Sequence, residues 1–131
     1  MKYLVDTSVL IHSIISQPKL NARALRLLAD VRSELHLSPV TSWEIAIKSG
    51  SGKLQLPGKP SEVVTRAIRL MSLQALDITH LHALAVEDLP NYHRDPFDRL
   101  LIAQALTERM VLLTADRVFE KYKVEQIYCG K

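Results

Sequence analysis

Short runs of apolar residues that suit buried β-strands alternate with longer segments of helical periodicity along the whole chain. The strands are expected at residues 2–5, 36–38, 75–78, 111–113 and 125–128. Helical spacing of apolar residues marks the segments 9–15, 21–33, 41–48, 61–72, 80–86, 96–110 and 117–122. Parallel strands need long crossovers, which are usually helical, so this alternation constrains the topology strongly. The pattern predicts an α/β fold with a central, mainly parallel sheet and helices on both faces.

The chain shows no repeat or linker, and its 131 residues predict a single domain spanning residues 1–131. No apolar run approaches the roughly 20 residues that a membrane span needs, and the N-terminal apolar stretch is too short for a signal peptide. Cys129 is the only cysteine, which rules out an internal disulfide and makes the cytoplasm the expected location. The net charge of +3 is compatible with a nucleic-acid partner without requiring one.

Four acidic residues come from separate segments that an α/β fold brings to one edge of its sheet. Asp6 follows the first strand directly, and Asp116 follows the fourth strand after two residues. Glu44 is expected in the first turn of the helix after the second strand. Asp98 is expected in the first turn of the apolar helix that precedes the fourth strand. Because ligands of such sheets bind at the carboxyl ends of the strands, we expect the four carboxylates to meet there.

Each acid also has a structural interpretation as a helix cap. Asp6 and Asp116 both stand where an N-cap would stand. Thr-Ser-Trp-Glu at 41–44 is a capping-box pattern, in which the Glu44 carboxylate would accept from the backbone three residues earlier. Residues 95–98 combine a cap, a proline at the first helical position and a first-turn acid. Capping explains each acid alone, but it does not require four acids at one edge.

The mutual repulsion of such a cluster indicates a cation. Two carboxylates about 4 Å apart repel by about 4 kcal/mol at an effective dielectric of 20. A hard divalent cation is the natural partner for an all-oxygen ligand set, so the sequence predicts Mg²⁺, with Mn²⁺ as an alternative and either one or two ions. Such an ion lowers the pKa of bound water and polarises a phosphoryl oxygen.

Four stretches of the chain form an ordered set of motifs: residues 5–10 (VDTSVL), 42–45 (SWEI), 95–103 (DPFDRLLIA) and 113–116 (LTAD). In their order and intervals they resemble PIN domains, and most closely the VapC-type toxins of type II toxin–antitoxin pairs. Each motif alone is weak, whereas the ordered set covers nearly the whole chain.

The resemblance implies a PIN fold and a metal-dependent endoribonuclease that cleaves RNA by attack of metal-activated water. The implied catalytic and metal-binding residues are Asp6, Glu44, Asp98 and Asp116. Positions that carry small hydroxyl residues near the metal correspond to Thr7, Ser8 and Thr114. Asp95 is an additional acid that either caps its helix or supports the site. The resemblance also implies a VapB-type antitoxin as partner and a homodimer.

Basic and aromatic residues beside the acids have both functional and structural interpretations. The possible contacts to an RNA backbone are Lys48, Arg94, Arg99 and Arg117. Lys48 would equally form an i,i+4 ion pair with Glu44. Trp43 is expected in the core or at a dimer interface, with base stacking as the alternative. His93 is expected to be an ordinary loop residue.

Two other functions fit parts of the sequence. A receiver-like signalling domain also places an aspartate and Mg²⁺ at strand ends, although it needs paired acids after the first strand, where only Asp6 is found. A catalytically silent module that binds RNA or a protein would need none of the acids. The residues also do not distinguish RNA from DNA as substrate.

Overall fold

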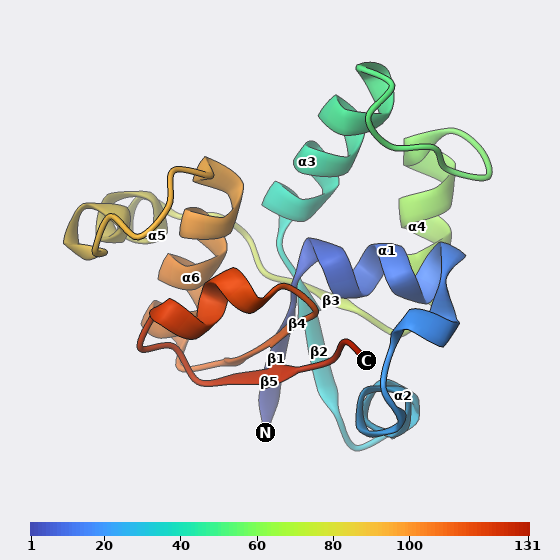
Figure 1. Ribbon diagram of the computed structural model, residues 1–131, viewed down its shortest axis with the longest axis horizontal. Coiled ribbons are helices and arrows are strands. Elements are labelled where there is room, and N and C mark those ends of the chain that lie inside the picture. The colour runs from blue at the N-terminus through green and yellow to red at the C-terminus, as the bar shows by residue number, and fades with distance from the viewer.

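The computed structural model describes residues 1–131 and has a five-stranded, fully parallel sheet. Figure 1 shows this sheet at the centre of the molecule, between the helices. The strands are β1 (Lys2–Val5), β2 (Glu34–Leu37), β3 (Gln74–Ala75), β4 (Val111–Thr114) and β5 (Gln126–Tyr128). Their order across the sheet is β3-β2-β1-β4-β5. The α/β class and the parallel sheet predicted from the sequence are confirmed.

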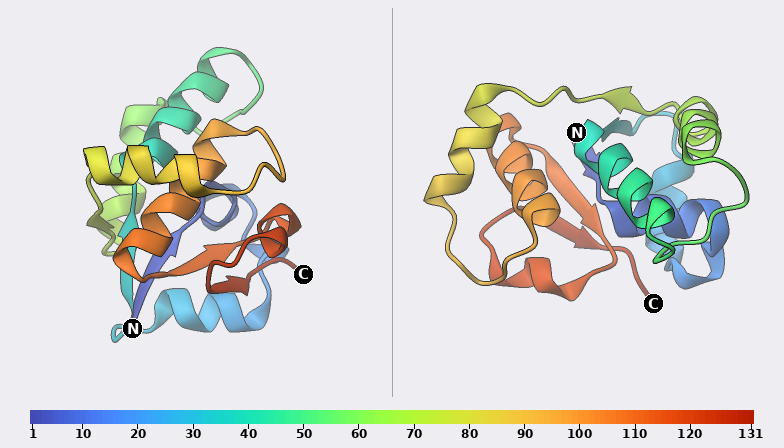
Figure 2. Two further views of the ribbon diagram at one scale, coloured as in Figure 1. Left: turned by 90° about the vertical axis from the view of Figure 1, so that its left-hand side faces the viewer. Right: turned by 90° about the horizontal axis from the view of Figure 1, so that it is seen from above.

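Helices cover both faces of this sheet. The α-helices are α1 (Thr7–Ile15), α2 (Ala22–Ala29), α3 (Pro39–Gly50), α4 (Pro60–Leu70), α5 (His80–Ala85) and α6 (Pro96–Glu108). Three short 3₁₀ helices complete the chain: η1 (Gln17–Lys19), η2 (Val86–Asp88) and η3 (Arg117–Lys121). In Figures 1 and 2, α1, α2 and α4 lie on one side of the sheet and α5 and α6 on the other, while α3 rises above its edge.

Alternating side chains of the central strands build two separate cores. Val5 and Leu113 belong to the cluster under α1, α2 and α4, whereas Leu4 and Leu112 belong to the cluster under α6. All four of these side chains are fully buried. Strands covered on both faces are apolar at every position, which explains why they appear in the sequence as continuous apolar runs.

The strand order creates a crevice next to β1. The chain passes outward from β1 through β2 to β3 and then returns to place β4 and β5 on the opposite side of β1. Connections leave β1 and β4 in opposite directions, so their carboxyl ends flank a topological switch point where α/β sheets bind ligands. Receiver domains have the strand order 2-1-3-4-5. The observed order therefore excludes the receiver-like alternative.

Some helix ends differ from the sequence prediction. The helix expected over 21–33 stops at Ala29, because Asp30 accepts a bond from the Arg32 backbone N–H (2.9 Å) and turns the chain away. Val31, which lies within the expected segment, is 98% exposed. The helix expected over 96–110 ends at Glu108, where Arg109 adopts the left-handed conformation (φ 55°). None of the helices combines the length and the apolar character that crossing a membrane requires.

Candidate active site

The four predicted acids line one pocket of about 290 Å³ at the carboxyl ends of β1 and β4. Ten residues surround this acidic pocket: Asp6, Thr7, Ser8, Ile11, His12, Glu44, Lys48, Asp95, Asp98 and Asp116. The predicted convergence of Asp6, Glu44, Asp98 and Asp116 is thereby confirmed.

Asp6 is held by two hydroxyl groups and leaves one oxygen free. Although it occupies the N-cap position of α1, its side chain makes no capping hydrogen bond. Its Oδ2 accepts from Ser8 Oγ (2.6 Å) and Thr114 Oγ1 (2.9 Å), and its Oδ1 is buried without a hydrogen-bond partner. Burial raises the pKa of Asp6 to about 6, although these hydrogen bonds oppose the rise. A buried carboxylate oxygen without a partner is costly for the folded protein.

Glu44 lies in the second turn of α3, so the expected first-turn position is wrong and the alternative interpretation of Glu44 as a cap is excluded. The helix starts earlier than expected, at Pro39, because the Ser38 hydroxyl accepts from the Val40 N–H (3.1 Å) and caps it. Glu44 Oε1 instead accepts from Thr7 Oγ1 (2.7 Å), and its Oε2 pairs with Lys48. The hydrogen bond from Lys48 to Glu44 raises the pKa of Lys48. The ion-pair interpretation of Lys48 is therefore realised in the structure.

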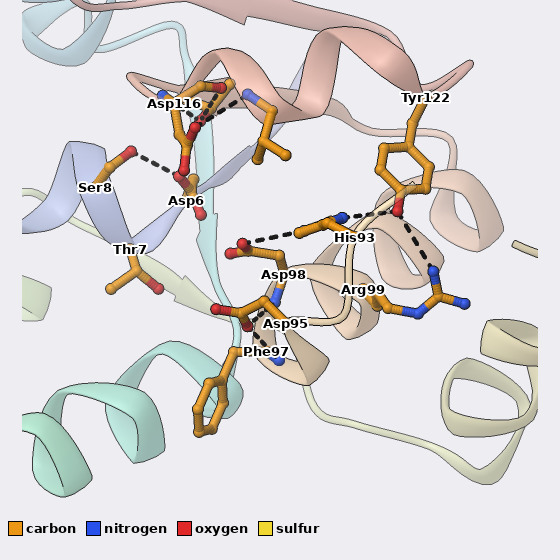
Figure 3. A network of polar contacts seen from close by, with 12 residues as sticks. Asp6, Thr7, Ser8, His93, Asp95, Phe97, Asp98, Arg99, Asp116 and Tyr122 are labelled. Atoms are coloured by element: carbon orange, nitrogen blue, oxygen red, sulfur yellow. Dashed lines mark hydrogen bonds and ion pairs between the residues drawn. The ribbon is translucent and has the colours of Figure 1, made fainter. Parts of the chain in front are cut away.

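Asp95 and Asp98 have different roles at the start of α6. Asp95 Oδ1 accepts from the backbone N–H of Phe97 (2.9 Å) and of Asp98 (3.1 Å), which confirms it as the cap. Asp98 Oδ2 lies 3.3 Å from His93 Nε2, and Figure 3 shows the two side chains facing each other. The pKa of Asp98 rises to about 8, first because of burial and then because of the surrounding negative charges of Asp6, Asp95, Glu44 and Asp116.

Asp116 is the single member of the four that caps a helix with its side chain. Its Oδ1 accepts from the Val118 N–H (3.0 Å) at the start of η3. The neighbouring backbone is tied to the first strand end, because the Ala115 N–H donates to Ser8 Oγ (3.0 Å). Capping thus accounts for Asp116, whereas Asp6, Glu44 and Asp98 make no cap bond and need another explanation.

The donor set of the acidic pocket fits a hard divalent cation. Every acidic ligand offers oxygen, Asp6 Oδ1 has no partner, and the charge of its neighbours helps to raise the pKa of Asp98. No group of three or more His, Cys, Asp or Glu side chains is already arranged to hold an ion jointly. Glu44 pairs with Lys48 and Asp98 contacts His93, so one oxygen of each carboxylate already has a partner within the protein.

The predicted RNA-contact arginines differ in how free they are. Arg99 donates to the carbonyl of Pro90 (2.8 Å) and approaches those of Val86 and Leu89. Its guanidinium is therefore held by the backbone of the segment before α6. Arg117 donates to Glu120 (2.6 Å) and stacks on the Tyr128 ring, 3.9 Å from its centroid.

Arg94 and Trp43 line a second pocket of about 320 Å³, together with Arg99 and apolar residues of α3, η2 and α6. Trp43 is 59% exposed, so of its two expected places the core is excluded, and a dimer interface stays a prediction. Its ring packs edge-on against Phe97 with centroids 5.2 Å apart.

Two histidines at the site were not anticipated from the sequence. His12 lines the acidic pocket, and its Nδ1 is buried without a partner. His93 contacts both Asp98 and Tyr122, although Tyr122 lies 29 residues further along the chain. Neither contact of His93 can be recognised from sequence spacing, since each depends on how the loop before α6 folds over another element.

Comparison with known proteins places this fold in a family. The VapBC2 structure from Rickettsia felis, bound to a DNA fragment from its promoter, has a TM-score of 0.73 and 18% identity over 99% of this chain and 100% of the matched chain. DNA-bound VapBC from Salmonella typhimurium has a TM-score of 0.69 and 18% identity, covering 98% of each chain. FitAcB from Neisseria gonorrhoeae has a TM-score of 0.64 and 20% identity, covering 95% and 96%.

At these identities the structural similarity establishes the fold alone. No curated protein matches the sequence. Residues 3–125, however, match the family described as PIN domain, and they include all four acids of the pocket. The chain therefore belongs to the PIN domain family.

Proposed function

We propose that this protein is the toxin of a toxin–antitoxin pair and acts as an Mg²⁺-dependent endoribonuclease at the acidic pocket. The observation that carries the proposal is the state of Asp6, which is 2% exposed, makes no cap bond and keeps Oδ1 without a partner. Folding alone does not favour ionised Asp6, because burial and the negative charge of Glu44 both raise its energy. A divalent cation removes both costs.

In this proposal the cation is held by Asp6, Glu44, Asp98 and Asp116, with Mg²⁺ as the physiological ion and Mn²⁺ as a substitute. When bound, it supplies activation of water and neutralises charge on a phosphodiester. The hydroxyls of Ser8 and Thr114 orient the Asp6 carboxylate, and that of Thr7 orients Glu44. Asp95 fixes the first turn of α6 and thereby the backbone of Asp98.

Cations around the acidic pocket support a polyanionic substrate. Lys48 lies in the pocket wall and Arg94 is exposed in the neighbouring pocket. We assign phosphate contacts to Lys48, Arg94 and Arg117. Arg99 is left out, because its donors are used by the loop carbonyls.

Membership of the PIN domain family and the fold shared with chains of VapBC and FitAcB structures support the biological setting. We propose that a VapB-type antitoxin binds this chain and blocks the acidic pocket, that the toxin forms a homodimer, and that it acts in the cytoplasm on RNA. An antitoxin that places a cationic side chain among the four acids would compete directly with the cation.

The test is cleavage of an RNA transcript by purified protein with Mg²⁺, with and without EDTA. Asp6→Asn is expected to lower the rate at least about 100-fold, because charge stabilisation at a reacting centre is typically worth that much. Asp88→Asn, the same change at an exposed site on η2, is the matched control and should keep full activity. A DNA strand of the same sequence tests the choice of RNA.

Cleavage that persists in EDTA and in Asp6→Asn would exclude the metal mechanism. The competing idea, a catalytically silent binding module, makes a separate prediction in cells. It requires that growth arrest on expression be equal for wild-type protein and Asp6→Asn, whereas the nuclease proposal requires that Asp6→Asn abolish the arrest.

A further inference from the structure

A chain of three polar side chains leads from Asp98 away from the acidic pocket, as Figure 3 shows. His93 Nε2 lies 3.3 Å from Asp98 Oδ2, and His93 Nδ1 lies 2.7 Å from the hydroxyl oxygen of Tyr122. Arg99 Nη1 lies 3.3 Å from the same hydroxyl oxygen. The loop before α6, the end of η3 and α6 itself therefore meet behind one acid of the pocket.

The donors in this chain favour one direction. A guanidinium can only donate, so the Tyr122 oxygen accepts from Arg99 and the tyrosine hydrogen is available to His93 Nδ1. A neutral imidazole that accepts at Nδ1 carries its hydrogen on Nε2. The chain consequently ends in an N–H group directed at Asp98 Oδ2.

Packing holds the chain in place. Tyr122 is 5% exposed, and the side chains of His93 and Asp98 are 17% and 15% exposed. The imidazole packs edge-on against the Tyr122 ring, with centroids 5.4 Å apart, and against the ring of Phe119 at 6.4 Å. The Arg99 guanidinium is itself anchored by the carbonyl of Pro90. The imidazole therefore has little freedom to turn away from the carboxylate.

We propose that His93 is a positioning residue for the cation site: by binding Oδ2 of Asp98, and being oriented by Tyr122 and Arg99, it leaves Oδ1 of Asp98 to the cation. Figure 3 shows the Asp98 carboxyl between His93 and Asp6, which is the placement that this division of its two oxygens needs. The inference rests on the proposed function, because it assigns to His93 an effect on the affinity of the same pocket for its ion.

The competing explanation is that the chain only fastens the loop before α6. In that case loss of His93 lowers stability and leaves cation affinity unchanged. Hydrogen-bond partners of metal ligands typically change metal affinity 10–100-fold when they are removed. The two explanations therefore differ in a binding constant that can be measured without any RNA.

The experiment is titration of the RNA-free protein with Mn²⁺, followed by electron paramagnetic resonance at one pH. His93→Phe is expected to weaken Mn²⁺ binding about 10-fold or more. His93→Gln keeps an N–H donor and should recover most of the affinity, and Tyr122→Phe, which frees the imidazole to change tautomer, should give an intermediate loss. His80→Phe, at an exposed histidine of α5, is the matched control and should bind as wild type.

Cleavage at saturating Mg²⁺ gives a second measurement. A positioning role predicts that high Mg²⁺ restores most of the rate of His93→Phe and that the KM for RNA stays unchanged. Thermal melting in EDTA reveals whether His93→Phe folds. If it does not, Tyr122→Phe and His93→Gln still distinguish a positioning role from a role in fastening the loop.

Wild-type protein that binds Mn²⁺ while all folded variants bind it equally well would overturn this inference and leave the proposed function intact. His93→Gln that binds as weakly as His93→Phe would also overturn it. Wild-type protein without saturable Mn²⁺ binding would overturn the proposed function, and this inference with it.

Discussion

Replacing the buried acid Asp6 with asparagine should remove the function and, without a cation, stabilise the fold. Asp6 is 2% exposed, and burial raises its pKa from 3.8 to about 6. Because a tenfold change in a proton-binding constant corresponds to about 1.4 kcal/mol, ionised Asp6 destabilises the folded state by about 3 kcal/mol at neutral pH. Asparagine is neutral and has nearly the same shape, so this cost disappears.

Part of the gain is lost again through hydrogen bonding. Ser8 and Thr114 both donate to Asp6 Oδ2, so the amide oxygen of asparagine would take that place and its NH₂ group would occupy the position of Oδ1. That position has no partner, and a buried unsatisfied donor costs about 1–3 kcal/mol. The net expectation for Asp6→Asn in EDTA is a stabilisation of about 0–2 kcal/mol, equivalent to a Tm increase of up to about 7 °C.

Thermal melting of both proteins, in EDTA and across a Mg²⁺ series, measures these quantities. Wild-type protein should gain about 2.7 kcal/mol, or roughly 10 °C, when Mg²⁺ is 100-fold above its Kd, and Asp6→Asn should gain less than a third of that. Two results would refute the reasoning: an Asp6→Asn variant that melts well below wild type in EDTA, or a variant that gains as much from Mg²⁺ as wild type does.

Three further predictions concern stability alone and use urea denaturation. The raised pKa of Asp6 contributes stability to wild type that is present below pH 4 and lost as pH rises through about 6. In EDTA, the free energy of unfolding of Asp6→Asn minus that of wild type should therefore rise by about 3 kcal/mol over that range, from a negative value to about 0–2 kcal/mol, and a constant difference would contradict the raised pKa. Ser38→Ala should destabilise the protein by about 1 kcal/mol, because Ser38 caps α3, whereas a helix that began at Thr41 would not respond. Asn21→Ala should lose about 2–3 kcal/mol, because Asn21 caps α2 and also donates to the carbonyls of Tyr128 and Gly130, and a loss below 1 kcal/mol would mean that these bonds contribute little.

The sequence predicts β1, β4 and β5 closely, whereas β2 and β3 begin earlier than the expected 36–38 and 75–78. β1 and β4 are apolar at nearly every position because both faces are covered, so their runs stand out from the flanking segments. Asp95 caps α6 with its side chain, as predicted, and Asn21 caps α2 in the same way. Helix ends are predicted less well, because the turn at Asp30 depends on a side-chain bond that helical periodicity does not reveal.

The acids of the site are predictable because the topology places them, whereas their partners are not. Asp6 and Asp116 follow strands, and any parallel α/β sheet brings such positions to one edge. The contacts of Glu44 with Thr7 and of Asp98 with His93 depend on how α3 and a loop pack against other elements. For Glu44 the sequence was equally compatible with a capping box, which the observed cap at Ser38 excludes.

The failure of the capping explanation connects stability with function in this protein. If the acids only capped helices, each would make a cap bond and lower the energy of the folded state. Asp6, Glu44 and Asp98 make no such bond. Ionised Asp6 alone costs about 3 kcal/mol, which is a large share of the 5–15 kcal/mol that stabilises a typical domain. A cation at about 100 times its Kd returns nearly the same amount. The folded fraction of this protein should therefore depend on the same ion that its proposed reaction needs, and an antitoxin that offers a cation to the acidic pocket should stabilise the fold for the same electrostatic reason.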